Sequence, residues 1–184
     1  MRKIFAAAIA CSLFACSNSS TNTDGAKNEM KAQVPSNMHG FTPAYSASFV
    51  MDSAKNTESV LALWKDWKDG DLSKSRSRFA DSVSIFFADG SSMSGLTDDV
   101  LKNTQEYRNM FPGMEVTVDA VFATKSTDKN ENFVTIWGVE ISTDKNGKKD
   151  TTSVQEVWRF NPAGKVDFMM QATRKGMLPP PPAN

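Results

Sequence analysis

Glu156 is the residue whose neighbours in the sequence best suit chemistry. It lies in the run 151–160, where Val154, Trp158 and Phe160 occupy alternate positions with it. Alternate side chains of a β-strand share one face, so we expect the Glu156 carboxyl on the same side as two aromatic rings. If that side is the protein interior, desolvation raises the pKa of the carboxyl, and a protonated acid could donate a hydrogen bond to a ligand oxygen. The other interpretation is a structural carboxylate, paired with a base or placed near an open rim.

Several common kinds of active site are missing from the sequence. The single histidine is His39, and the only cysteines are Cys11 and Cys16, all of them before the region that we expect to fold. A histidine-dependent triad, a thiol nucleophile and an ordinary zinc site are therefore excluded from the domain. The chain also has no Gly-rich phosphate loop and no dinucleotide fingerprint. We predict that the domain uses no cofactor and no metal.

The first twenty residues predict export from the cell. Two basic residues precede the short apolar run 4–15, and the polar residues 17–20 follow, which is a signal peptide pattern too short to span a membrane. Leu13-Phe14-Ala15-Cys16 resembles a lipobox, at which bacterial lipoproteins are lipidated on the cysteine and cleaved, although Phe14 replaces the usual small residue. Cys11 is a second candidate, and secretion without a lipid is the alternative. We expect a signal peptide over 1–15 and a lipid anchor on Cys16, holding the protein in the cell envelope, at the outer membrane by resemblance to other lipoproteins.

Charge argues against two classes of partner. The chain has 21 basic and 21 acidic residues, and removal of residues 1–15 takes away Arg2 and Lys3 but no acid. The mature chain then carries 19 bases and 21 acids, a net charge of −2. A nucleic-acid partner would need a basic stripe, and electrostatic membrane binding would need a basic cluster. We therefore expect neither a nucleic-acid partner nor electrostatic binding to a membrane.

Hydrophobic periodicity predicts one α+β domain. Residues 16–45 are polar and indicate a flexible tether, 46–175 form the domain, and the Pro-rich residues 176–184 form an extended tail. Helical spacing follows position 56 and ends at Gly70, Asp71 can cap a second short helix, and a third helix covers 97–110. Strands are expected over 82–88, 115–123, 133–142, 151–160 and 166–173. Helices first and antiparallel strands afterwards suggest a curved antiparallel sheet wrapped around three helices as a cone.

Several short strings occur in an order typical of one superfamily. They are Gly70-Asp71-Leu72, Phe79-Ala80-Asp81, Gly90, Ser94-Gly95, Trp158-Arg159-Phe160-Asn161 and Gly164-Lys165-Val166. Their order and spacing resemble the nuclear transport factor 2-like superfamily, which includes the SnoaL-like proteins and ketosteroid isomerase. The resemblance covers roughly residues 55–174. It implies a cone-shaped α+β barrel whose open end holds a small, mostly apolar ligand, and many members are dimers through the outer sheet face.

The catalytic residues of that superfamily are mostly absent when they are carried over by position. The isomerase base falls on Phe87, its tyrosine donor on Leu63, and its second oxyanion donor on Glu156. The His and Asp of many SnoaL-like proteins fall on Met169 and Gln171. Isomerisation by the known mechanism is disfavoured, because phenylalanine cannot act as a base.

The resulting ligand-site hypothesis combines these positions with the aromatic residues, each of which could instead be simple core packing. The expected lining is Leu63, Trp67, Phe87, Tyr107, Trp137, Glu156, Trp158, Met169 and Gln171. The last strand is ambiguous, because its pattern would bury Val166, Phe168, Met170 and Ala172, whereas the resemblance points Met169 and Gln171 inward. Both hold if the first set forms the interface of a homodimer.

These observations favour a membrane-tethered domain without catalytic activity, which binds a small apolar molecule or an envelope protein. The alternative is an isomerase, hydrolase or cyclase acting on a small carbonyl or polycyclic substrate, with Glu156 as acid or oxyanion donor and Gln171 positioning the substrate. A third interpretation is an interaction module that binds another envelope protein through its exposed sheet face.

Overall fold

The computed structural model describes residues 34–176. The expected signal peptide, Cys16, the first part of the tether and the tail beyond Gly176 lie outside the described residues. His39 is exposed in the part of the tether that is described. Tyr45, where we expect the tether to end, packs edge-on against Phe133. In the described part of the chain, no helix has the length and apolar character needed to cross a membrane.

Three helical segments precede most of the sheet, as the sequence predicts. They are α1 (Ala54–Asp69), the 3₁₀ helix η1 (Leu72–Arg78) and α2 (Thr97–Arg108). Gly70 ends α1 with φ +81°, in the left-handed region that glycine adopts most easily. The Asp71 carboxylate then accepts a hydrogen bond from the Ser73 backbone N–H at the start of η1. The chain therefore turns sharply between α1 and η1.

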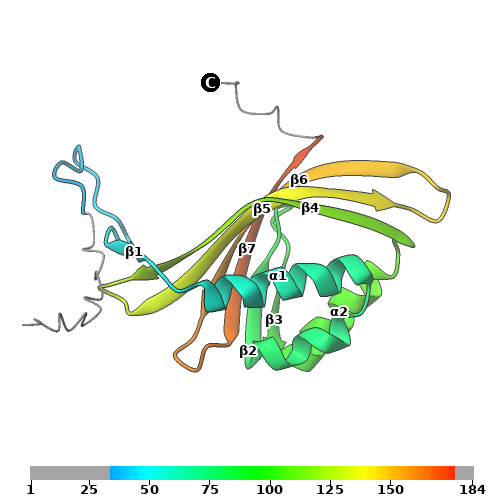
Figure 1. Cartoon of the computed structure of the whole chain (residues 1–184), viewed down its shortest axis with the longest axis horizontal. Helices are drawn as coiled ribbons and strands as arrows, with labels where there is room; N and C mark the ends of the chain where they lie inside the picture. Colours follow the sequence, from blue (N-terminus) through cyan, green and yellow to red (C-terminus); the bar gives the residue numbers. More distant parts are fainter. Residues whose placement is uncertain (1–33, 177–184) are drawn as a thin grey trace, which may run out of the picture.

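In the described part of the chain, seven strands form a single curled sheet. They are β1 (Phe49–Met51), β2 (Phe79–Phe86), β3 (Ser92–Leu96), β4 (Gly113–Ser126), β5 (Glu131–Thr143), β6 (Lys149–Phe160) and β7 (Val166–Lys175), in the order β1-β4-β5-β6-β7-β2-β3. All neighbours are antiparallel except β2 and β7, which are parallel. Figure 1 shows α1 and α2 on one face of the sheet, with β4, β5 and β6 arching over them. The expected α+β architecture, a curved sheet around helices, is confirmed, although this sheet curls without closing.

Two short strands and several strand starts differ from the sequence-based expectation. β1 and β3 were not predicted, β2 begins at Phe79, three residues before the expected start, and β4, β5 and β6 each begin two residues early. β1 has only three residues and pairs with the far end of β4, and β3 is largely exposed. Neither strand has the alternation of apolar and polar residues that marks a half-buried strand.

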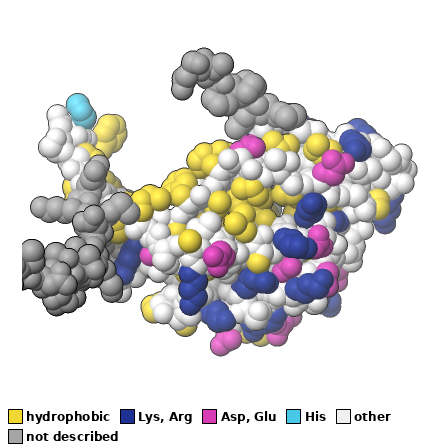
Figure 2. Space-filling model, in the orientation of Figure 1, with side chains coloured by type: hydrophobic (Ala, Val, Ile, Leu, Met, Phe, Trp, Pro, Cys, Tyr) yellow, Lys and Arg dark blue, Asp and Glu magenta, His cyan; other side chains and the backbone are white. Residues whose placement is uncertain are grey.

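The core lies between the helices and the inner face of the sheet. Its most deeply buried apolar side chains are Val60 of α1, Val134 and Ile136 of β5, Phe160 of β6 and Val166 of β7. Facing residues on a helix and a curved sheet can bury one apolar layer in this way. On the outer surface that Figure 2 shows, acidic and basic side chains are interspersed and a hydrophobic cluster lies near the middle.

Candidate functional site

A large cavity opens between the helices and the inner face of the sheet. Its volume is about 710 Å³, within the range typical of sites for small molecules. Aromatic side chains from α1, α2 and β6 line it, among them Trp67, Tyr107 and Trp158. Two glutamates, Glu140 of β5 and Glu156 of β6, also line it. The cavity wall therefore combines aromatic and aliphatic side chains with polar and charged ones, which also include Asp89, Asp144, Lys148, Asp150 and Lys175.

Glu156 lies at the buried side of this cavity, as its alternation with apolar residues predicts. Its Oε2 accepts hydrogen bonds from the indole N–H groups of Trp64, at 2.6 Å, and Trp158, at 3.0 Å. Its Oε1 accepts one from the Gln171 side-chain amide, at 3.0 Å. Burial raises the pKa of the Glu156 carboxyl, and these three donors oppose the rise. Each oxygen of the carboxyl thus has a partner within the protein.

The local backbone explains how Trp64 reaches this carboxyl. Trp64 lies on α1, which packs against β4 and β5 where Gly138 replaces a side chain. A Cβ at Gly138 would lie 2.0 Å from the Thr117 carbonyl oxygen and 3.1 Å from the Trp64 ring. The register of β4 against β5 shifts beside this position, between Val118 and Ala120. Glycine at position 138 therefore permits the Trp64 indole to pack directly against the β5 backbone and to reach Glu156.

Glu140 is a polar group of the cavity that the sequence analysis missed. It shares the inner face of β5 with Val134, Ile136 and Gly138. Burial raises its pKa to about 7, and the neighbouring charge of Glu156 adds to the rise. By register, Glu140 pairs with Thr152 and Glu156 pairs with Ile136, so the two glutamates are offset by four positions, roughly 13 Å of strand. Both faces of β5 carry apolar residues, so the sequence has no signal that marks the face of Glu140 as the inner one.

Trp67 and Arg108 are the two residues that lower the pKa of Glu140. The Trp67 Nε1–H faces the carboxyl and opposes the rise of its pKa, but without hydrogen-bond geometry, and this buried Nε1 has no hydrogen-bond partner among the described residues. The Arg108 guanidinium lies over the Trp67 ring, 5.8 Å from its centroid, and also lowers the pKa of Glu140. Arg108 donates to the carbonyl oxygens of Trp67 at 2.6 Å, Lys68 at 2.9 Å, and Phe111. It therefore holds the end of α1 in place while lending positive charge to this side of the cavity.

Eight of the nine residues expected to line a ligand site do meet at this cavity. They are Leu63, Trp67, Phe87, Tyr107, Glu156, Trp158, Met169 and Gln171. Tyr107 stacks on Trp67, with ring centroids 6.3 Å apart, and burial raises the pKa of its hydroxyl. Phe87, at the position of the superfamily's base, follows β2 and contributes only its ring.

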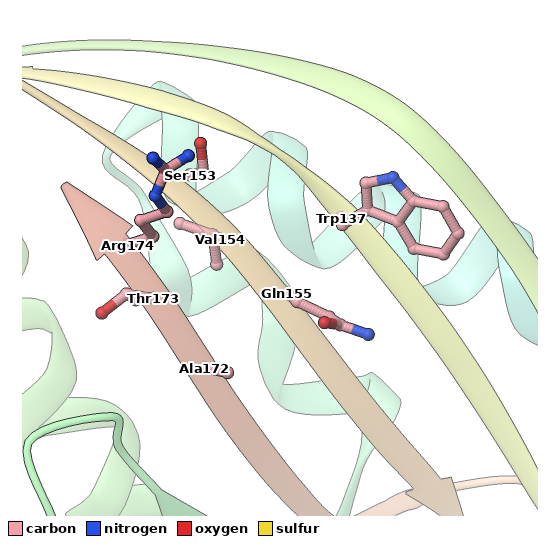
Figure 3. Close-up of a pocket in the computed structure, with 7 residues that line it drawn as sticks. All are labelled: Trp137, Ser153, Val154, Gln155, Ala172, Thr173 and Arg174. Atoms are coloured by element: carbon pink, nitrogen blue, oxygen red, sulfur yellow. The ribbon is translucent and has the colours of Figure 1, made fainter. Parts of the chain in front are cut away.

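The ninth residue, Trp137, lies on the opposite face of the sheet, and the structure does not bring it to this cavity. Alternation along β5 sends its side chain away from Ile136 and Gly138, and its ring packs edge-on against Phe122. Figure 3 looks onto this face, with the helices behind the strands, and shows Trp137 of β5 and Gln155 of the neighbouring β6. Both residues line a separate depression of about 390 Å³.

The ambiguity in the last strand is resolved by a bulge. The register of β6 against β7 shifts between Arg159 and Phe160, so Val166 is buried inside, whereas Phe168 and Met170 do not line the cavity. Met169 and Gln171 line it, as the resemblance implies. Met170 is 51% exposed. The apolar outer face is thus available for a partner, although pattern alone would have buried it.

Within residues 34–176, no three His, Cys, Asp or Glu side chains lie close enough together to hold a metal ion.

Solved structures identify the fold. No protein-family model and no curated protein matches the sequence. The structure is similar to a nuclear transport factor 2-like protein of unknown function from Burkholderia pseudomallei, with 19% identity, a TM-score of 0.53, and coverage of 65% of this chain and 90% of the other. It is also similar to a protein of ketosteroid isomerase-like fold from Catenulispora acidiphila, with 17% identity, a TM-score of 0.51, and 62% and 83% coverage.

An enzyme is among the similar structures. SalBIII, an epoxide hydrolase/cyclase-like enzyme of pyran ring formation in salinomycin, has 18% identity, a TM-score of 0.52, and coverage of 70% of this chain and 95% of its own. The fold is therefore found both in enzymes and in proteins of unknown function. The described domain has the nuclear transport factor 2-like fold, which the ketosteroid isomerase-like proteins share.

Proposed function

We propose that this chain is a lipid-anchored envelope protein that binds a small, mostly apolar molecule in its cone without catalysing a reaction. The observation that carries the proposal is the cavity of about 710 Å³, with aromatic walls and a buried polar group at Glu156. A preformed apolar cavity with a few convergent polar groups is the usual form of a small-molecule site.

The state of Glu156 supports binding over catalysis. Its two oxygens already accept three hydrogen bonds from Trp64, Trp158 and Gln171. A general base must be free to take a proton from the substrate, and Phe87 supplies none. The carboxyl and its donors therefore suit a rigid wall of the cavity.

The test of ligand binding is native mass spectrometry of the protein purified from the organism that makes it. We expect added mass from a retained small molecule. Thr104→Trp should abolish the added mass, because Thr104 lines the cavity and a tryptophan there would fill it. The matched control is Lys102→Trp, which places the same ring on the exposed side of α2. Retention of the mass in Thr104→Trp would contradict the proposed site.

A second candidate function is an enzyme that uses Glu156 as an acid. The convergence of Glu156 and Gln171 at the cavity favours it, since a neutral carboxylic acid beside an amide could polarise a substrate carbonyl. If the retained molecule is converted by the wild-type protein and not by Glu156→Gln, this candidate replaces the binding role. If both proteins leave it unchanged, the binding role is favoured.

The lipid anchor is tested separately from the cavity. In a detergent phase-separation assay, the wild-type chain should enter the detergent-rich phase. Cys16→Ser should remain in the aqueous phase. Cys11→Ser is the control, because Cys11 lies in the segment expected to be removed. Loss of partitioning in Cys11→Ser alone would move the anchor to Cys11.

A further inference from the structure

We propose that Glu140 recognises the ligand in the cavity by accepting a hydrogen bond from a hydroxyl group on the bound molecule. This inference rests on the proposed function, because it assumes that an apolar molecule occupies the cavity. It names the chemical class of that molecule as an alcohol or phenol with an apolar body.

Two tryptophan–glutamate pairs line the cavity, and they differ in how fully they are bonded. Trp64 and Trp67 are neighbours on one side of α1, and each faces a glutamate of the sheet. In the first pair the carboxyl is fully bonded, since Glu156 accepts a hydrogen bond from Trp64 at 2.6 Å and has two further donors. In the second pair no hydrogen bond forms, since Trp67 does not reach Glu140 with hydrogen-bond geometry.

Glu140 therefore has acceptor capacity that the described residues leave unused. It is largely shielded from solvent, yet its side chain borders the cavity. A partly buried carboxyl whose nearby donor, the Trp67 N–H, lacks hydrogen-bond geometry is costly, and a group that enters the cavity with an O–H would offset that cost. Glu156 offers no such opportunity, because its oxygens already have protein partners.

A neutral donor suits Glu140 better than a cation, because burial of a charged ligand group costs far more free energy than burial of a hydroxyl. The charges that act on Glu140 do not select a cation, since the buried Arg108 guanidinium lowers its pKa whereas the charge of Glu156 raises it. A hydroxyl avoids the cost of burying a second charge and still donates to the carboxylate, and a hydrogen bond to a charged acceptor is stronger than one between neutral groups.

The inference is tested with four probes that share a naphthalene skeleton, using equilibrium dialysis of the full chain at pH 8. The probes are 2-methylnaphthalene, 2-naphthylmethanol, the methyl ether of that alcohol, and 2-naphthylmethylamine. We expect the alcohol to bind about 3- to 10-fold more tightly than the hydrocarbon, the range of one net hydrogen bond. The ether should lose this advantage because it cannot donate, and the amine should bind more weakly than the alcohol.

Variants at one position locate the effect. Glu140→Met replaces the carboxyl with an apolar group of similar size, so the preference for the alcohol should fall to within about twofold while the hydrocarbon binds as before. Glu140→Gln keeps an acceptor oxygen and should retain part of the preference. The control, Glu106→Met, makes the same change at an exposed position of α2 and should leave the preference intact.

The outcomes separate this inference from the proposed function. If 2-methylnaphthalene does not bind to the wild type at all, the apolar site itself is refuted. If the hydrocarbon binds but the alcohol and ether bind alike, or the preference survives in Glu140→Met, the role of Glu140 is refuted and the apolar site stands. Tighter binding of the amine than of the alcohol would overturn the hydroxyl class. The comparison of alcohol and ether needs no variant, so it decides the question even if Glu140→Met does not fold.

Discussion

The raised pKa of Glu140 predicts that folding stability falls as the pH rises. In the folded protein this pKa is about 7, compared with 4.5 as the ordinary value for a glutamate. The folded state therefore holds a proton that the unfolded chain releases between these two pH values. Stability from this group is full below about pH 4.5 and is lost as the pH rises through 7.

The magnitude follows from the size of the rise. One pKa unit corresponds to about 1.4 kcal/mol, so a rise from 4.5 to about 7 corresponds to about 3 kcal/mol. Because Glu140 borders an open cavity, solvent reduces this figure, and about 2–3 kcal/mol is the expected loss. Glutamine has nearly the same shape and no charge. Glu140→Gln should therefore match the wild type near pH 4.5 and exceed its unfolding free energy by about 2–3 kcal/mol at pH 8.

The assay is urea unfolding followed by tryptophan fluorescence at intervals from pH 4.5 to pH 8.5. The difference between the two proteins removes the contributions that other titrating groups make equally to both. Glu106→Gln, an exposed acid on α2, is the control and should parallel the wild type. If the difference between Glu140→Gln and the wild type does not change with pH, burial of Glu140 is not costly. If the wild type gains on the variant as the pH rises, attraction to Arg108 outweighs desolvation and the reasoning is wrong.

Three further predictions concern the buried network, the sheet and its outer face. Glu156→Leu leaves two buried indole donors without acceptors and should destabilise the protein by about 2–6 kcal/mol in urea unfolding, whereas Glu156→Gln keeps an acceptor and should lose far less. Gly138→Ala should lower the unfolding free energy by about 3 kcal/mol, since the added Cβ lies 2.0 Å from a backbone oxygen, whereas Gly113→Ala approaches the Thr143 side chain only to 3.0 Å and should lose less; equal losses would refute the close approach. Light scattering of residues 34–184 should show a homodimer that Met170→Lys dissociates, because Met170 is exposed on the apolar outer face; a wild-type monomer at high concentration would refute it.

The elements that bury a face could be predicted from the sequence, and the others could not. α1 is marked by Val60, Leu63 and Trp64 at helical spacing and by Gly70 at its end. β6 is marked by Val154, Trp158 and Phe160 on one face. β1 and β3 carry little apolar alternation because they pair at the edges of the sheet and bury little. Their positions are set by tertiary hydrogen bonding, which leaves no periodic signal.

The same physical reason explains which parts of the site were found. Glu156 stands out because one face of β6 is apolar and the other carries Gln155 and Arg159. β5 is apolar on both faces, with Val134 and Ile136 on one and Phe133 and Trp137 on the other. Parity alone could not tell which face of β5 is the inner one. Trp137 was therefore expected at the site, and Glu140 was not.

The two glutamates of the cavity differ in their hydrogen bonding, and this difference suits them to different roles. A buried carboxyl with three donors has one arrangement of lowest energy, so Glu156 fixes Trp64, Trp158 and Gln171 relative to one another. Because Glu156 already fixes the cavity wall, the carboxyl of Glu140 can remain without a hydrogen-bond donor from the protein. A fold that paired both glutamates fully would be more stable but would have no free acceptor for a ligand. The loss of stability expected at Glu140 with rising pH is therefore the energetic counterpart of the binding role that we propose for it.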